Sequence, residues 1–247
     1  MKKWFVFAAC FISVYLGFLL VNLPAAYVAS WVSLPKNISA VGIGGSLWRP
    51  TIERVVVNGQ HIEKVHAEVS IFSLLSLNPK ITARFGDPAL TPIDGRVTVN
   101  NLLSAPVLSE TVINLPAALI AKQISTPVAI TAHRYISISL SSFQVGTPIC
   151  QQLAGKAFWK NAGVTVMDQK IPLGDLSGQL SCQAGEAVLS IDSNNDIGLT
   201  FTVNVGANGY AYGQGYILPT SKTPQAIMQV LPMVTKKDAQ GRYPLRF

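Results

Sequence analysis

The chain has 247 residues, of which 49% are hydrophobic and only 13% are charged. That charged share is about half of the usual one, which excludes a disordered polypeptide, a coiled coil and a highly solvated helical bundle. Nineteen Lys and Arg outweigh twelve Asp and Glu, so the net charge is +7. The basic residues are scattered rather than gathered in a stripe with aromatic residues between them, so we expect no nucleic-acid partner.

The first predicted element is a transmembrane helix over residues 4–23. Lys2 and Lys3 precede this apolar run, and no further charge occurs before Lys36. A bilayer core about 30 Å thick needs roughly 20 apolar residues in a helix. Because basic residues stay on the cytoplasmic side, we expect a cytoplasmic N-terminus and a translocated chain beyond the helix.

A cleaved signal peptide is the alternative for this segment. Signal peptides have an apolar region of about 7–15 residues followed by a small-residue cleavage site. Here the apolar run is longer, and the best site, at residues 28–30, is followed by more apolar residues. These features favour a retained anchor. We therefore divide the chain into residues 1–35, which hold a cytoplasmic stub, the anchor and an interfacial linker, and a single exported domain over 36–247.

Short alternating strands dominate the exported part. Residues 52–71 predict a hairpin that turns at Asn58-Gly59, a pair typical of type I′ turns. Residues 136–141 alternate Ile or Leu with Ser, as in a strand with one buried face. About ten strands follow from such patterns. We expect a mainly β domain, an extended antiparallel sheet or sandwich-like fold, with two or three short helices near residues 72–77, 115–123 and 224–230.

Gly42-Ile43-Gly44-Gly45 has the composition of a phosphate-binding loop. A dinucleotide fingerprint, however, needs a strand before it and a helix after it. Trp48-Arg49-Pro50 argues against a helix here. We interpret the glycines as a flexible entry to the first strand.

Trp48 and Trp159 each follow a glycine closely, precede a basic residue and lead into a predicted hairpin. A duplication of two halves, near residues 45–140 and 155–247, is one explanation, and chance in a Gly-rich chain is the other. Each tryptophan has two interpretations, packing in the core or contact with a partner protein.

The cysteines agree with export. Cys10 lies inside the predicted anchor, whereas Cys150 and Cys182 are the two cysteines of the exported part. A pair of cysteines in an oxidising compartment predicts a structural disulfide. A redox-active pair is the alternative, but the chain has no Cys-x-x-Cys motif.

Residues for catalysis or metal binding do not converge in the sequence. His61 and His66 differ by five positions, so on one strand they point to opposite faces, and the third histidine, His133, is remote. Asp192 and Asp196 flank a polar turn, and no Ser lies in a Gly-x-Ser-x-Gly motif. We expect a non-enzymatic protein without a metal or cofactor, which works by binding through strand edges or the apolar face of its sheet.

Five groups of residues follow one another along nearly the whole chain. They are Leu23-Pro24-Ala25; Val41-Gly42 with Gly45-Ser46-Leu47-Trp48; Pro148-Ile149-Cys150 with Gly155 and Trp159-Lys160-Asn161-Ala162; Leu173-Gly174-Asp175-Leu176-Ser177-Gly178-Gln179-Leu180-Ser181-Cys182; and Asp238-Ala239-Gln240-Gly241-Arg242-Tyr243-Pro244-Leu245. In order and spacing, the chain resembles the type II secretion system protein N family of Gram-negative bacteria.

This resemblance implies a non-enzymatic accessory of the machine that moves folded proteins from the periplasm across the outer membrane. It implies a location in the cell inner membrane beside the secretion platform, with other inner-membrane subunits as partners. It also implies a bridge between Cys150 and Cys182.

A lipid-handling role is the second hypothesis. An antiparallel sheet tethered to the membrane can curl so that its apolar face forms a groove for acyl chains. Residues 71–75 resemble the corresponding stretch of anchored envelope proteins that contact lipid, so lipid is the second expected partner.

Overall fold

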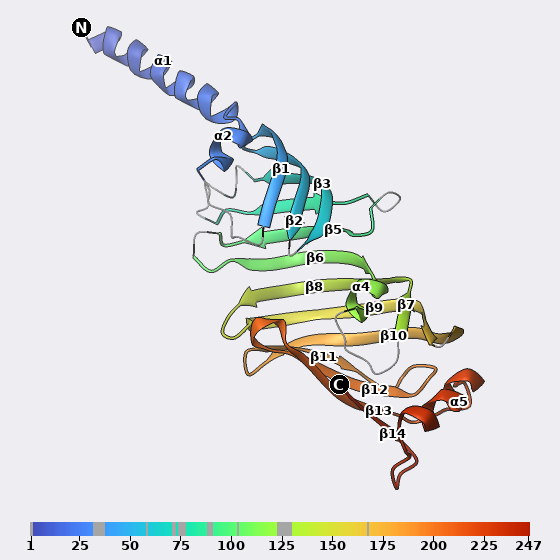
Figure 1. Ribbon diagram of the computed structural model, residues 1–247. Coiled ribbons are helices and arrows are strands. Elements are labelled where there is room, and N and C mark those ends of the chain that lie inside the picture. Colours follow the sequence, from blue (N-terminus) through green and yellow to red (C-terminus); the bar gives the residue numbers. More distant parts are fainter. Residues whose placement is uncertain are drawn as a thin grey trace. The chain divides into compact units, whose positions relative to one another are not determined.

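The computed structural model describes residues 2–31, 38–57, 59–70, 73, 78–87, 91–102, 104–122, 130–166 and 168–247. These residues form one long helix, several short helices and fourteen strands, shown in Figure 1. The strands pair in antiparallel fashion, for example β9 with β10, and consecutive strands are mostly neighbours. The mainly antiparallel β class expected from the sequence is therefore confirmed.

The chain divides into two compact units. Unit 1 comprises Met1–Asp94 and Asn100–Leu103, and unit 2 comprises Gly95–Val99 and Ser104–Phe247. Strand β5, Asp94–Asn100, contributes residues to both units. The single exported domain over 36–247 stays a prediction.

Unit 1 is a long helix followed by a β meander. The predicted hairpin is confirmed, because Val57 pairs with Gln60 across a tight turn in which Gly59 has a φ of +80°. Gly59 suits this turn because glycine adopts positive φ without steric cost. In chain order the elements are α1 (Lys2–Val21), α2 (Ala25–Ala29), β1 (Ile38–Ser46), β2 (Arg49–Val57), β3 (Gln60–Val69) and β4 (Ile81–Phe85).

The glycines at positions 42, 44 and 45 lie inside strand β1, so their interpretation as a flexible entry is wrong. Ile43 pairs with Ile52 of β2 in the middle of this run. Gly42 has a φ of +72°, and a Cβ there would lie 2.6 Å from the Glu53 side chain. The glycines thus allow β1 and β2 to approach where a side chain would collide.

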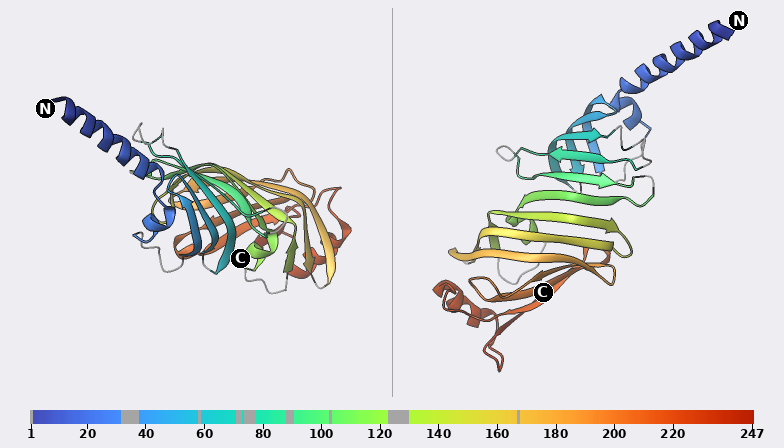
Figure 2. Two further views of the ribbon diagram at one scale, coloured as in Figure 1. Left: turned by 90° about the horizontal axis from the view of Figure 1, so that it is seen from above. Right: turned by 180° about the vertical axis from the view of Figure 1, so that it is seen from behind.

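Unit 2 is built from longer strands. The longest of them, β9, has 17 residues. The strand order of unit 2 is β6 (Val107–Pro116), β8 (Tyr135–Val145), β9 (Cys150–Val166), β10 (Gln169–Gln183), β11 (Glu186–Ile191), β12 (Leu199–Val205), β13 (Ala211–Ile217) and β14 (Tyr243–Arg246). Strand β7 (Ile130–His133) also pairs with β9. Figure 2 shows the strands in two further views.

The short helices of unit 2 match two of the predictions. The helix expected over 115–123 is α4 (Ala117–Ala121), which begins only after strand β6 has ended at Pro116. The helix expected over 224–230 is α5 (Gln225–Val234). A one-turn 3-10 helix, η1, spans Ala207–Gly209. The helical turn expected over 72–77 lies outside the described residues except for Ser73.

The hydrophobic core of unit 2 lies where α5 packs on the sheet. Ile227 and Leu231 of α5 are each only 5% exposed. They cluster with buried residues of β10, β13 and β14, including Ile171, Ile217 and Tyr243. Burying such side chains supplies most of the stability of a small sheet.

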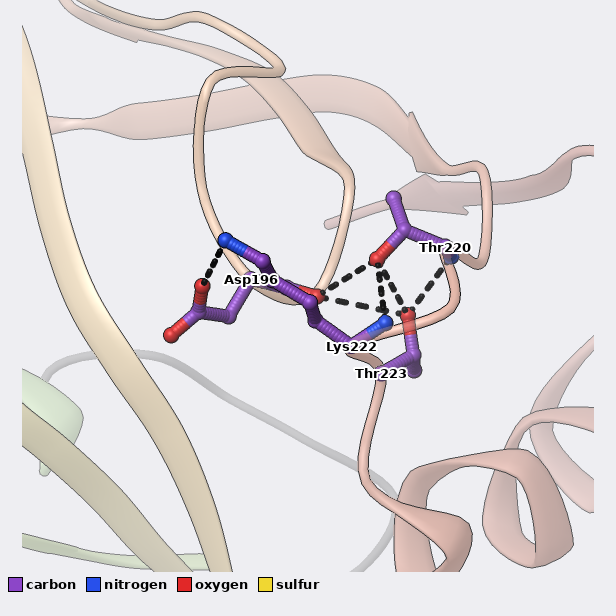
Figure 3. Close-up of polar contacts among 4 residues, drawn as sticks. All are labelled: Asp196, Thr220, Lys222 and Thr223. Carbon is purple, nitrogen blue, oxygen red and sulfur yellow. Dashed lines mark hydrogen bonds and ion pairs between the residues drawn. The ribbon is translucent and has the colours of Figure 1, made fainter.

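A polar network fixes the loop that leads into α5, as shown in Figure 3. The Thr220 hydroxyl donates a hydrogen bond to the Asp196 backbone oxygen at 2.9 Å, and the Thr220 amide donates to Thr223 Oγ1 at 2.7 Å. Lys222 Nζ lies 4.0 Å from Asp196 Oδ1. The network ties the loop to the β11–β12 connection, next to the buried Ile197.

We predict that Leu231→Ala destabilises the protein by about 2–5 kcal/mol, because it leaves a cavity under α5. Met228→Ala is the matched control on the same helix, since Met228 is 38% exposed. Urea unfolding of the purified chain measures both changes. Equal losses in the two variants would contradict the packing of α5 described above.

Candidate functional site

The apolar surface of helix α1 is not covered by the described residues of the chain. An apolar span of 19 residues, Lys3–Val21, is 0% buried, and Trp4 and Phe5 are 83% and 77% exposed. Soluble proteins rarely leave so large an apolar surface uncovered. Within the described part of the chain this is the one helix long and apolar enough to cross a membrane, and it coincides with the predicted anchor.

The C-terminal end of α1 is tied to the turn between β1 and β2. The indole Nε1 of Trp48 donates a hydrogen bond to the Leu20 backbone oxygen at 2.9 Å. The Leu47 amide donates to the Leu23 oxygen at 2.8 Å, and Pro24 forms an antiparallel bridge with Ser46. We call these residues, 20–24 and 46–48, the anchor junction.

The anchor junction provides hydrogen-bond donors for carbonyl groups in the last turn of α1. The last four carbonyl groups of an α-helix have no intrahelical partner. The Leu20 oxygen accepts from Trp48 Nε1 in addition to the Leu23 amide, and the Phe18 oxygen accepts from the Asn22 side chain at 2.8 Å in addition to the Asn22 amide. Gly45 enables the adjoining turn, because its φ is +77° and a Cβ there would collide with the Arg49 carbonyl. The end of α1 is thus held by specific hydrogen bonds.

Helix α2 follows the junction and packs on the first strands. Ala25 is only 6% exposed, and α2 contacts β1 and β2. Tyr27 and Trp31 are 57% and 73% exposed, and their rings meet edge to face at 5.1 Å. Exposed Tyr and Trp next to an apolar helix are typical of a membrane–water boundary.

The structure places the second tryptophan differently. Trp159 Nε1 donates to the His133 backbone oxygen at 2.8 Å, and its ring packs against the core of unit 2. The His133 ring forms a hydrogen bond with Thr165 Oγ1 at 2.7 Å. Trp48 therefore belongs to the anchor junction and Trp159 to the edge of the core. A partner contact by either residue stays a prediction.

The expected disulfide is confirmed. Cys150 at the start of β9 is bonded to Cys182 near the end of β10, with a Cα–Cα distance of 6.1 Å. Cys150 is only 2% exposed, so the bridge lies in the interior of unit 2. Cys10 on α1 is free and exposed.

A broad groove lies on one face of the unit 2 sheet, with a volume of about 930 Å³. It crosses four strands, because Val112 of β6 pairs with Ser139 of β8, which pairs with Lys156 of β9, which pairs with Gln179 of β10. Paired residues of neighbouring strands share one face. The groove is thus a row of cross-strand neighbours.

The groove combines small and apolar residues. Phe158 and Val112 line it and are 41% and 40% exposed. Gly155 and Gly178 have no room for a side chain, because a Cβ would lie 2.5 Å from the Ser139 oxygen at Gly155 and 2.7 Å from the Leu189 side chain at Gly178. Lys156 also lines the groove and is exposed. The groove is thus lined by apolar, small and charged residues together.

The described residues contain no group of three or more His, Cys, Asp and Glu side chains that could hold a metal ion. His61 and His66 both lie on β3. Asp192 lines the groove, whereas Asp196 belongs to the loop network that precedes α5. No cluster of titratable groups in this part of the chain forms a catalytic arrangement.

The Asp238–Tyr243 stretch of the family-like pattern has a structural role. Asp238 accepts hydrogen bonds from the Gln240 amide at 2.9 Å and from Arg242 Nε at 2.8 Å. Desolvation raises the pKa of Asp238, but hydrogen bonds from Arg242 and Gln240 outweigh it, so that the net pKa lies below the ordinary value. The Arg242 guanidinium stacks over the Tyr216 ring at 4.7 Å. Tyr243 directly follows this turn and lies in the core, where it is 4% exposed.

The described residues form a β-sheet protein with long antiparallel strands, one disulfide and one N-terminal apolar helix that is long enough to span a membrane. A family model, that of the type II secretion system (T2SS), protein N, matches residues 36–246, and the chain belongs to this family. It is therefore a type II secretion component.

Two relatives carry the same family description. The chain is 29% identical to the type II secretion system protein N of Aeromonas hydrophila, over 100% of this chain and 98% of that protein. It is 25% identical to the type II secretion system protein N of Vibrio cholerae serotype O1, over 99% of this chain and 97% of that protein. No solved structure matches the chain.

Two features of the site, the hydrogen bond of the anchor junction and the groove, were not predicted from the sequence. The hydrogen bond of the junction joins residues 28 positions apart, which no local pattern reveals. The groove depends on the register of four strands. In this register Ser137 and Ser139 lie opposite Phe158 and Lys156, a pairing that no local pattern reveals.

We predict that Trp48→Phe, which keeps an aromatic ring but removes the indole N–H, weakens the junction by about 1 kcal/mol. The Leu47 amide then exchanges about fivefold faster with deuterium in the full chain in detergent micelles, since it bonds to the same end of α1. Trp31→Phe is the control, because Trp31 is exposed. Unchanged exchange in Trp48→Phe would show that the bond does not hold the helix.

Proposed function

We propose that this protein is a non-enzymatic scaffold of the type II secretion system, held in the cell inner membrane by α1 with both units in the periplasm. The observation that carries the proposal is the bare apolar helix whose C-terminal end is bonded to the sheet through Trp48. A merely cleavable segment does not need such a junction.

The orientation follows from charge and chemistry. Lys2 and Lys3 precede the span, and basic residues remain on the cytoplasmic side of a membrane helix. The Cys150–Cys182 disulfide fits an oxidising compartment such as the periplasm. Both features support the same direction of insertion.

The edge of β1 is the surface we assign to a partner subunit. Among the described residues, no strand pairs with the outer edge of β1, where only the bridge at Pro24 reaches Ser46. Val41 on this strand is 59% exposed. An open strand edge accepts a strand of another chain through backbone hydrogen bonds. A neighbouring inner-membrane subunit of the secretion machine fits this position, since β1 ends at the anchor junction.

We predict that replacing residues 2–30 with a cleaved signal releases the periplasmic part and reduces secretion of substrate proteins. The reduction follows because the edge of β1 is no longer held beside the other membrane subunits. The control replaces α1 with an unrelated transmembrane helix and keeps residues 20–24, and it should restore secretion. Unchanged secretion by the released form would remove the anchor from the function.

The groove of unit 2 supports a second candidate function, the binding of lipid. Its volume of about 930 Å³ lies in the range of small-molecule sites, and Phe158 and Val112 provide exposed apolar surface within it. Lys156 offers a cation for an anionic head group. The stretch 71–75, which first raised this hypothesis, lies outside the described residues except for Ser73.

We predict that the natively purified chain carries bound phospholipid if the groove has this role, and that Ser139→Trp removes it by filling the groove. The control is Ser193→Trp, which places the same side chain on an exposed turn. Mass spectrometry of extracted lipid measures the amount per chain. Equal amounts of lipid in both variants would exclude the groove as the binding site.

A further inference from the structure

The chain contains an internal repeat that is distinct from the two tryptophan motifs. Residues 22–41 and 114–133 align without a gap and are identical at ten of twenty positions. The shared residues begin with Asn-Leu-Pro-Ala-Ala in both copies. The identical pairs are Asn22/Asn114, Leu23/Leu115, Pro24/Pro116, Ala25/Ala117, Ala26/Ala118, Ala29/Ala121, Ser33/Ser125, Pro35/Pro127, Ile38/Ile130 and Ala40/Ala132.

The two copies have the same local structure. Pro24 and Pro116 precede α2 and α4 with nearly equal dihedral angles, φ −67° and ψ 134° against φ −60° and ψ 131°. Both helices have five residues and bury their first alanine, which is 6% exposed in α2 and 2% exposed in α4.

In both copies the proline also pairs with a strand residue, although not at the same position of the repeat, because the partner is at the end of β1 in the first copy and at the start of β8 in the second. Each proline pairs in antiparallel fashion with a strand residue, Pro24 with Ser46 and Pro116 with Tyr135. The returning strands β1 and β7 begin at Ile38 and Ile130, which occupy the same position in the repeat. The repeat is therefore one structural element used once in each unit.

If α1 crosses the membrane, the first copy lies at the membrane surface. The inference below rests on this part of the proposed function. A helix of 20 residues is about 30 Å long, which brings residues 22–31 to the level of the lipid head groups. Tyr27 and Trp31 are exposed there, as aromatic residues of a membrane boundary are. Helix α2 is thus an interfacial element.

The second copy presents apolar and basic residues together. Ile120 on α4, Ile130 on β7 and Tyr135 at the start of β8 are 36%, 39% and 51% exposed. Lys122, which follows α4, and Arg134, which precedes β8, are also exposed. Helix α4 packs beside β7, so these residues gather around one short helix. Exposed apolar side chains with neighbouring cations are typical of surfaces that bind anionic membranes.

We infer that α4, with Ile130, Arg134 and Tyr135 beside it, is a second membrane-contact element, which binds the surface of an anionic phospholipid bilayer as α2 does. Ile120 and Tyr135 enter the interface, and Lys122 and Arg134 bind the phosphate groups. The repeat thereby gives each unit its own contact with the bilayer.

The test uses the full chain in vesicles of phosphatidylethanolamine and phosphatidylglycerol. In a Cys10→Ser background, Ile120→Cys is labelled with an environment-sensitive fluorophore, and lipids with a nitroxide near the head group serve as quenchers. Tyr27→Cys is the positive control. Val145→Cys is the matched negative control in unit 2, since Val145 is 70% exposed. We expect about twofold quenching or more at positions 27 and 120 and none at 145.

Each other outcome is decisive. Quenching at position 27 with none at 120 would overturn the second contact and leave the anchor intact, whereas no quenching at either position would overturn the anchor as well. Charge reversal by Lys122→Glu and Arg134→Glu should abolish quenching at 120, and quenching that survives it would contradict anionic-lipid binding. Protection of position 120 only in membranes that hold other secretion subunits would assign α4 to a protein partner instead.

Discussion

The structure depends on one uncovered surface, the apolar side chains of α1. Nothing among the described residues of the chain packs on this helix, so its 19-residue span must be covered from outside, and a bilayer is the medium that suits its length. The hydrogen bond from Trp48 to Leu20 then makes the end of the helix part of the sheet. The bond holds the end of α1 against the turn between β1 and β2.

Unit 2 shows how a sheet with few charges is stabilised. Helix α5 covers one region of the sheet and completes the core with Ile227 and Leu231, and the Asp196 network fixes the loop that positions this helix. The disulfide joins the two longest strands, β9 and β10. The groove lies across β6, β8, β9 and β10, along the cross-strand row of Val112, Ser139, Lys156 and Gln179. The core under α5 and the groove thus use different residues of the same sheet.

The sequence predicted the features that local patterns determine. The apolar run after Lys2 and Lys3, the Asn58-Gly59 turn, the Ile–Ser alternation of β8 and the cysteine pair each depend on a few neighbouring residues or on composition, and each was found in the structure. Strand β1 was missed because three of its nine residues are glycines, whose strand role depends on contacts with β2. Strand β6 was missed for another reason, because its last residues, Leu115 and Pro116, were taken for the start of a helix. The junction and the groove depend on register between distant segments, which no local pattern contains.

The most direct test of the central claim, that α1 crosses the membrane and delivers both units to the periplasm, is a topology measurement with two reporters. Alkaline phosphatase, which is active only after export, and a fluorescent protein that matures only in the cytoplasm are each joined after Phe247 of the full chain. Active phosphatase and a dark fluorescent fusion are the results that this account predicts. Inactive phosphatase with a bright fluorescent fusion would contradict it.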